Sequence, residues 1–340
     1  MQFAYLTHDD IPKTLYHYTS LEALVAIVQT KRLRASNIRF LNDESESLQL
    51  KEDVIAILQK RAKSSEDQEL LRNLIYSLES APRQSFFVAS LSEKSDLLSQ
   101  WRAYCPSGLG VSIGISSDSL NEQWVANPDG AKPFFLSAPF QKVRYYESAH
   151  QSELEQMVER LLDIERKGDV NEPSKYPNLN VLAAIAPLFK NANFEEGELD
   201  EIVRKTFDKI IEVEGKHGVK RYLPGSAMAS WVFLLSPFVK HGAFMEECEW
   251  RKVVSKDSRP MPGQKFRSGK STLIPFVEIM LDVMRVGAEC VPRDKYFIDE
   301  VIVGPTPTPE LTQEALRSLF DSQGHPEVIV RSSCIPFRNW

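Results

Sequence analysis

The segment Leu15–Val28 constrains the fold of this chain most, because it predicts a strand that runs directly into a helix. Leu15–Ser20 is a short stretch rich in aromatic residues, which is typical of strands. Thr19 is the predicted helix N-cap, and Glu22 three residues later completes a capping box. The apolar residues that follow have the spacing i, i+3, i+4 and i+7 of one buried helix face, namely Leu21, Leu24, Val25 and Val28.

Size and charge exclude several classes of protein. A chain of 340 residues fits one large domain or two modest ones. Its net charge of −6 argues against bulk, sequence-independent binding of nucleic acid, although a local basic groove stays open. No apolar run is long enough to cross a bilayer, the N-terminus lacks a signal-peptide pattern, and the four cysteines form no CxxC pair. We therefore expect a cytoplasmic protein with reduced thiols and no membrane partner.

Strand patterns recur on both sides of a helical region. Six short apolar or alternating runs predict strands, at Ser85–Ser92, Val111–Ile115, Glu249–Val254, Leu273–Ile279, Tyr296–Val303 and Glu327–Ser333. Helical periodicity covers Glu44–Leu78 and Pro309–Ser322, and it dominates residues 150–240, where the apolar stretch Ala227–Val239 predicts a buried helix. We expect a single domain over residues 1–340, with residues 150–240 as a helical insertion or cap.

Standard catalytic signatures are absent from the sequence. It contains no Walker loop, no GxGxxG after a strand, no GxSxG elbow and no HExxH. The six histidines show no metal-ligand spacing, so no metal site is expected. These absences argue against Walker-type nucleotide hydrolysis, hydride transfer and zinc chemistry.

His17 is the first candidate for a functional residue, and it has two interpretations. A lone histidine is most often half-buried, with its ring bonded to a backbone carbonyl. The surroundings of His17 favour a functional role, because a helix N-terminus presents free amides to an anionic ligand and aromatic neighbours can sandwich a flat heterocycle. Tyr18, Thr19 and Ser20 are the candidate binding residues beside it.

An acidic cluster at Glu246–Arg251 is the second candidate. In a strand, Glu247 and Glu249 point to the same face. Two such carboxylates repel each other unless solvent, a cation or a substrate hydroxyl lies between them. Charged side chains are common on exposed strand edges. Trp250 and Val253 nevertheless indicate a strand that lies mostly inside, where a carboxylate pair is costly and therefore points to a function.

The remaining candidates compete with structural explanations. Asn42–Glu44 fits a helix cap. Ser92 lies on a strand rich in phenylalanine and can simply fill a packing gap. Trp101 and Tyr104 are three positions apart on a predicted helix, which is a spacing typical of a core.

The order of these segments resembles the bacterial domain-of-unknown-function family 2971. The resemblance is carried by LYHYTS, LEALVAIV and RLRASNIRFLNDESE, then by FFVASLSEKSDLLSQWRAYCPSGLGVSIGI, KVRYY and PFVKHGAFMEECEWR. It runs from Leu15 to the final strand, with the helical stretch as the variable part. Members of this family are associated in bacteria with phage defence and abortive infection, which implies a similar setting for this chain.

A second, looser resemblance is to the start of the ADP-ribosyltransferase fold. It rests on the strand with an aromatic-flanked histidine, followed by a helix and the RLRAS strand. It implies an α+β protein with a strand-rich, ADP-ribosyltransferase-like core and NAD as substrate. His17 would contact the ribose hydroxyls, while Glu249 or Glu247 would be the catalytic carboxylate. The residues implied to line the nicotinamide pocket are Ser92, Trp101 and Tyr104.

Three functions stay open at this point. The first is NAD-dependent transfer of ADP-ribose to nucleic acid or protein, or hydrolysis of NAD. The second is a nucleotide-binding sensor without catalysis, in which Glu247 and Glu249 are a structural charge pair bonded to Arg251 or Lys240. The third is a nuclease that holds Mg²⁺ between Glu249 and the acidic residues of the Asn42–Glu44 loop, Asp43 and Glu44.

Overall fold

The chain divides into two compact units in a computed structural model. One unit combines residues 1–8, 43–84 and 144–242, and the other combines residues 9–42, 85–143 and 243–340. The structure describes residues 11–41, 46–80, 86–105, 109–121, 123–126, 134–136, 140–146, 154–155, 158–159, 232, 236–254, 263–269, 271–286 and 289–336. Most of the helical insertion predicted over residues 150–240 therefore lies outside the described residues.

A 12-stranded sheet forms the larger of the two units. Its main path has the order β16-β15-β4-β1-β3-β2-β12-β5-β6, with β10 added to β3, β7 to β10, and β11 to β12. Its strands are β1 (Thr14–Thr19), β2 (Arg32–Asn37), β3 (Phe87–Ser92), β4 (Val111–Ser116), β5 (Gln123–Val125), β6 (Phe134–Leu136), β7 (Gln141–Lys142), β10 (Glu249–Val254), β11 (Lys265–Ser268), β12 (Leu273–Met280), β15 (Ile298–Val303) and β16 (Ile329–Ser332).

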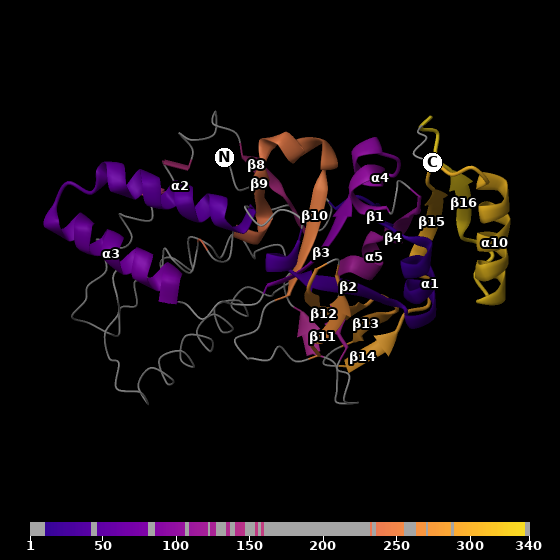
Figure 1. The fold of residues 1–340 in the computed structure, drawn as a ribbon. Coiled ribbons are helices and arrows are strands. Elements are labelled where there is room, and N and C mark those ends of the chain that lie inside the picture. The colour runs from indigo at the N-terminus through magenta and orange to yellow at the C-terminus, as the bar shows by residue number, and fades with distance from the viewer. Residues whose placement is uncertain are drawn as a thin grey trace. The chain divides into compact units, whose positions relative to one another are not determined.

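The strands lie side by side in Figure 1, from β10 through β3, β1 and β4 to β15 and β16. Strand β16 is parallel to β15, and α10 (Pro309–Ser322) packs beside both. A separate hairpin joins β13 (Val283–Val286) to β14 (Glu289–Pro292). The remaining helical elements of this unit are α1 (Leu21–Thr30), η2 (Ile38–Phe40), α4 (Leu98–Tyr104), α5 (Ser117–Asn121) and most of η7 (Gly242–Glu247).

The sheet is split along one edge of β3. Strand β10 pairs with β3 along its whole length and occupies the other edge. On the split edge, β1 pairs at Ser92, whereas β2 pairs at Val88 and Phe87. Both strands are antiparallel to β3, so they are parallel to each other and separate beside Ala89–Leu91. This split is the feature that positions the candidate site.

The junction of β1 and α1 differs from the sequence prediction in its cap and buried face. Ser20, not Thr19, is the N-cap, because β1 continues through Thr19 and the Ser20 hydroxyl accepts a hydrogen bond from the Ala23 amide at 3.1 Å. The buried residues of α1 are Leu24, Ile27 and Val28, whereas Leu21 and Val25 are exposed. The helix is rotated relative to the predicted face, so that Ile27 packs inward in place of Val25.

Buried side chains pack around β1 near both of its ends. Leu15 is completely buried with Ile113 and Ile115 of the neighbouring strand β4. Tyr18 packs edge-to-face on Trp101 of α4, with ring centroids 4.8 Å apart. Burial of large apolar and aromatic side chains of this kind supplies most of the free energy that holds a sheet together.

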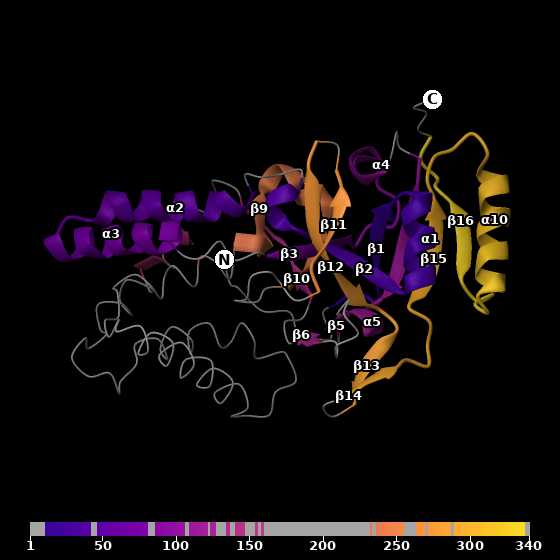
Figure 2. The same ribbon diagram turned by 60° about the horizontal axis from the view of Figure 1, so that its bottom comes forward.

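The described part of the smaller unit includes the helices α2 (Glu46–Arg61) and α3 (Ser65–Ser80) and a short pair of parallel strands. The expected helix over Glu44–Leu78 is divided into α2 and α3, which lie side by side in Figure 2. The Ser64 hydroxyl accepts from the Asp67 amide at 3.0 Å, as an N-cap does, so a second helix starts there. Strands β8 (Arg144–Tyr146) and β9 (Val239–His241) pair in parallel, and η6 (Ser236–Phe238) precedes β9.

The six predicted strands and the C-terminal helix are confirmed. The six predicted strands correspond to β3, β4, β10, β12, β15 and β16, with ends within two residues, and α10 has the predicted bounds. The coarse expectation of a strand-rich protein with several helices is therefore correct. The helix predicted over Ala227–Val239 lies mostly outside the described residues, and its end forms η6 and β9 instead. No helix in the described ranges is long and apolar enough to cross a membrane.

Candidate functional site

A pocket of about 190 Å³ lies at the split between β1 and β2. Strands β1, β2 and β3 line it, together with residues of α4, β10, β11 and η7. The structure brings together six of the nine predicted site residues in this pocket, namely His17, Tyr18, Ser92, Tyr104, Glu247 and Glu249.

His17 combines the two interpretations that its sequence position allowed. Its Nδ1 lies 3.1 Å from the carbonyl oxygen of Ser90, within the gap between the split strands. Because a carbonyl only accepts hydrogen bonds, Nδ1 carries the hydrogen and Nε2 keeps a lone pair in the neutral ring. Burial lowers the pKa of His17, and the hydrogen bond to Ser90 opposes that shift. The ring is therefore neutral near pH 7 and can accept a hydrogen bond from a ligand hydroxyl.

Glu249 is held by a buried ion pair. Arg251 donates from Nε to Oε1 at 2.7 Å and from its terminal nitrogen to Oε2 at 2.9 Å. The two side chains are 2% and 7% exposed, and they lie on the same face of β10 because they are two residues apart. This bidentate geometry holds the carboxylate in a fixed orientation.

Glu247 does not share a strand with Glu249, contrary to the prediction. It ends the 3₁₀ helix η7, and β10 begins only at Glu249. Cys248 between them has a φ of 45°, in the left-handed region, so the chain turns sharply there. Ser92 fastens this turn to β3, since its hydroxyl donates to the Glu247 carbonyl at 2.6 Å and accepts from the Lys94 amide at 3.0 Å.

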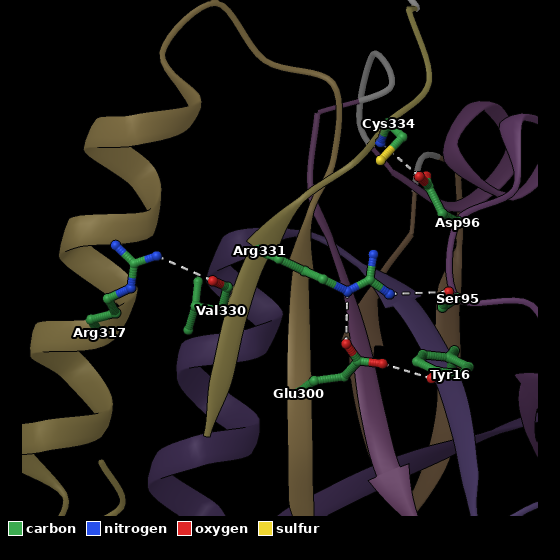
Figure 3. Close-up of polar contacts among 8 residues, drawn as sticks. All are labelled: Tyr16, Ser95, Asp96, Glu300, Arg317, Val330, Arg331 and Cys334. Carbon is green, nitrogen blue, oxygen red and sulfur yellow. Dashed lines mark hydrogen bonds and ion pairs between the residues drawn. The ribbon is translucent and has the colours of Figure 1, made fainter. Parts of the chain in front are cut away.

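Tyr16, the residue before His17, also lines the pocket and was not among the predicted site residues. Figure 3 shows its hydroxyl directed at Glu300, to which it donates at 2.7 Å, while Arg331 donates to the other carboxylate oxygen at 2.8 Å. Burial raises the pKa of Tyr16, and the hydrogen bond to Glu300 raises it further. Gly114 on the strand between them makes room, because a Cβ there would lie 3.0 Å from Glu300 Cγ and 3.1 Å from the Tyr16 ring.

The other aromatic candidates have separate positions. Tyr104 is 40% exposed and lies at the pocket. Trp101 is completely buried in the core, and its ring nitrogen donates to Asp96 at 2.8 Å. Asp96 also accepts from the backbone amide of Cys334, which ties the chain after β16 to the start of α4 (Figure 3). Tyr18 lines the pocket, but its hydroxyl is already bonded to the backbone of Lys94 and Leu97.

Thr19 and Ser20 serve the backbone in the structure. The Thr19 carbonyl accepts from the Cys105 thiol at 3.5 Å, and Ser20 caps α1. In contrast, Arg34 of β2 and Arg267 of β11 line the pocket and were not singled out from the sequence. The alternation of Arg34 with the buried residues Leu33 and Ala35 was the available signal for an arginine on the opposite face.

No candidate metal centre is found in the described part of the chain. No group of three or more histidine, cysteine, aspartate or glutamate residues is arranged there to hold an ion. Asp43 and Glu44, which the nuclease hypothesis requires beside Glu249, lie outside the described residues.

The fold and the pocket define a strand-rich protein with a small pocket at a split in its sheet, where charged and aromatic side chains meet. Residues 100–252 match the model of a family described as "Protein of unknown function (DUF2971)". The match confirms the resemblance to this family, and it runs from α4 to β10, so it includes Tyr104, Glu247 and Glu249. No curated protein and no solved structure matches the chain.

Proposed function

We propose that the pocket binds NAD and cleaves the bond between nicotinamide and ribose, transferring ADP-ribose to a nucleic acid or protein, or to water. The observation that carries the proposal is that His17, Glu247 and Glu249 line one pocket at the split between two parallel strands. These are the residues that the resemblance to ADP-ribosyltransferases implied. That resemblance also implies a strand-rich core.

The pocket residues have the chemistry that this reaction needs. Nicotinamide leaves with the bonding electron pair, and the ribose carbon acquires oxocarbenium character, which a nearby carboxylate stabilises. Glu247 or Glu249 would supply that carboxylate and orient the attacking hydroxyl, amine or water. The neutral ring of His17 would accept a hydrogen bond from a ribose hydroxyl. A volume of about 190 Å³ is below the ~300–1,000 Å³ of pockets that enclose a whole ligand, so only the nicotinamide–ribose end would be enclosed.

Release of nicotinamide by the purified chain tests the proposal. The wild type should consume NAD, and His17→Ala, Glu247→Gln and Glu249→Gln should be compared with it. Loss of a group that stabilises transition-state charge lowers the rate on the order of a hundredfold or more. The catalytic carboxylate is the one of the two whose loss has that effect. Absence of NAD consumption by the wild type, or wild-type rates in all three variants, contradicts the proposal.

The control must separate chemistry from stability. Glu249→Gln leaves Arg251 buried without its carboxylate, which costs about 3–5 kcal/mol in such pairs. Glu93→Gln is the matched control, because Glu93 accepts from Lys142 at 2.6 Å and Trp250 at 2.8 Å on the neighbouring strands without lining the pocket. Rates should be expressed per folded protein, and Glu93→Gln should keep the wild-type rate.

A defence role adds a cellular readout. If the chain is the toxic arm of a bacterial defence system, its expression in a bacterial host should arrest growth while the cellular NAD concentration falls. The variant that abolishes NAD consumption in the purified protein should abolish both effects. Growth arrest with an unchanged NAD concentration would contradict this role.

The ion pair between Glu249 and Arg251 favours a second candidate function. A carboxylate whose two oxygens are both bonded to a guanidinium has less charge to offer a substrate. The pocket would then recognise a nucleotide without turning it over, as a sensor does. Addition of NAD or another nucleotide should in that case raise the melting temperature, since a ligand that binds only the folded state stabilises it, with no nicotinamide released.

A further inference from the structure

Two arginines form a basic side of the pocket opposite its carboxylates. Arg34 of β2 and Arg267 of β11 both line the pocket, as does Ser36. The register places these side chains on one face of the sheet, because Arg34 lies opposite Glu278 of β12, and Arg267 lies opposite Ile274, four residues earlier on the same strand. Strand β12 lies between the two arginines and joins their strands.

Positive charge exceeds negative charge on the part of this face that β2, β12 and β11 form. The cationic residues of these three strands on this face are Arg32, Arg34, Lys265 and Arg267, and they surround the single carboxylate that the three strands place there. That carboxylate, Glu278, accepts from Arg32 and from Lys265, each at 2.8 Å. The guanidinium of Arg34 lies over the Phe276 ring, 4.9 Å from its centroid. Within the described ranges, neither Arg34 nor Arg267 has an acidic partner at ion-pair distance.

The two guanidinium groups disfavour each other in the present arrangement. Burial lowers the pKa of Arg267, and the positive charge of Arg34 lowers it further. Arg34 is exposed and Arg267 is half-buried, and two like charges that repel each other are stabilised when an anion binds between them. Guanidinium groups match phosphate oxygens with paired, charge-assisted hydrogen bonds, so phosphate is the anion that this geometry fits best.

The geometry points to a phosphate-binding subsite formed by Arg34 and Arg267, which takes the phosphate or diphosphate group of a nucleotide ligand. This inference rests on the proposed function in taking the ligand to be a nucleotide. It also gives the ligand a direction, because the two arginines attract phosphate, whereas Glu247 and Glu249 in the same pocket offer it no positive charge. The phosphates would lie against β2 and β11, and the sugar end would lie against His17 and Glu249.

Binding to the full chain tests the subsite without requiring turnover. Calorimetry would compare ADP-ribose, inorganic pyrophosphate and nicotinamide riboside, which has no phosphate. Arg34→Gln and Arg267→Gln should each weaken ADP-ribose about tenfold or more, as expected for loss of a charged hydrogen bond. Pyrophosphate binding should weaken in parallel, and nicotinamide riboside affinity should stay unchanged. The lysine variants Arg34→Lys and Arg267→Lys should retain part of the affinity.

The matched control is Arg317→Gln on α10, which removes the same charge from an arginine bonded to Gln313 and Val330. It should leave all three affinities unchanged. The inference is overturned if the wild type binds neither ADP-ribose nor pyrophosphate, if both pocket variants keep the wild-type affinity, or if the control weakens binding equally. A wild type that binds phosphate through these arginines without consuming NAD supports the subsite and contradicts only the proposed catalysis. If both variants consume NAD with an unchanged KM, the proposed catalysis is supported and the phosphate subsite is contradicted.

Discussion

His17 shows how one side chain can serve the fold and the pocket together. Its Nδ1–H satisfies the Ser90 carbonyl beside the split, where β1 and β2 have separated. An unsatisfied buried carbonyl would cost free energy, so this hydrogen bond helps to keep the split open. The same bond fixes the tautomer and leaves Nε2 as an acceptor.

Stability should depend on pH through His17. Its pKa is lowered in the folded state, so the unfolded chain takes up a proton at a higher pH than the folded chain does. The stability that neutral His17 provides is complete above about pH 6.5 and is lost as the pH falls through the lower, folded-state pKa. Urea unfolding from about pH 8 to about pH 5 should show a smaller loss of stability in His17→Gln, whose side-chain amide still donates to Ser90. Identical pH profiles would show that this proton uptake is negligible.

At the scale of single elements, strand β4 decides where Tyr16 can reach. Gly114 lies between Tyr16 on β1 and Glu300 on β15 in the register of the sheet. Without a side chain at Gly114, the Tyr16 ring crosses the strand, and its hydroxyl meets the carboxylate that Arg331 holds (Figure 3). The cross-strand neighbour of Tyr16 on the other side is Ser92.

Gly114→Ala should therefore destabilise the sheet by about 1–3 kcal/mol, as overpacking of a core does. The added Cβ would lie 3.0 Å from Thr14 Cγ2 and from Glu300 Cγ and 3.1 Å from Tyr16 Cε1, so these side chains must shift. Urea unfolding measures the loss, and ligand affinity should fall with it. Gly324→Ala is the control: its φ is +79° but nothing lies within 4 Å, so it should cost about 1 kcal/mol and leave ligand affinity unchanged. Equal effects of both changes on the ligand would contradict the role of Gly114.

At the scale of the whole molecule, the sheet of the larger unit is assembled from three separate stretches of chain. Backbone hydrogen bonds within this unit join the segments that flank residues 43–84 and residues 144–242. The Ile38 amide donates to the Phe86 carbonyl at 2.8 Å, and the Val143 amide donates to the Glu249 carbonyl at 2.8 Å. The residues that line the pocket also belong to this unit.

The larger unit should consequently fold without residues 43–84 and 144–242. Because the flanking strands are direct neighbours, short Gly/Ser linkers can replace both segments. The shortened protein should unfold in one cooperative transition, followed by circular dichroism, and should bind the same ligands as the full chain. An aggregated product, or one without a cooperative transition, would show that the removed segments are needed for folding.

The sequence by itself determined most of the local structure and the chemistry available to the site. Apolar or alternating runs located β3, β4 and β10, and helical periodicity located α10, because these signals depend on neighbours along the chain. The sequence also singled out His17, Glu247 and Glu249 as polar residues in apolar surroundings. The buried face of α1 could not be predicted from the sequence, since the elements that pack against the helix decide that Ile27 is buried in place of Val25.

Only the tertiary structure decided which of these residues meet. The split beside β3 depends on strand pairings between distant segments, and such pairings leave little trace in local sequence. The tertiary structure decided that Glu249 pairs with Arg251 and that Glu247 belongs to a turn. The tertiary structure also decided that Arg34 and Arg267 reach the same pocket, while Glu278 pairs with Arg32 and Lys265.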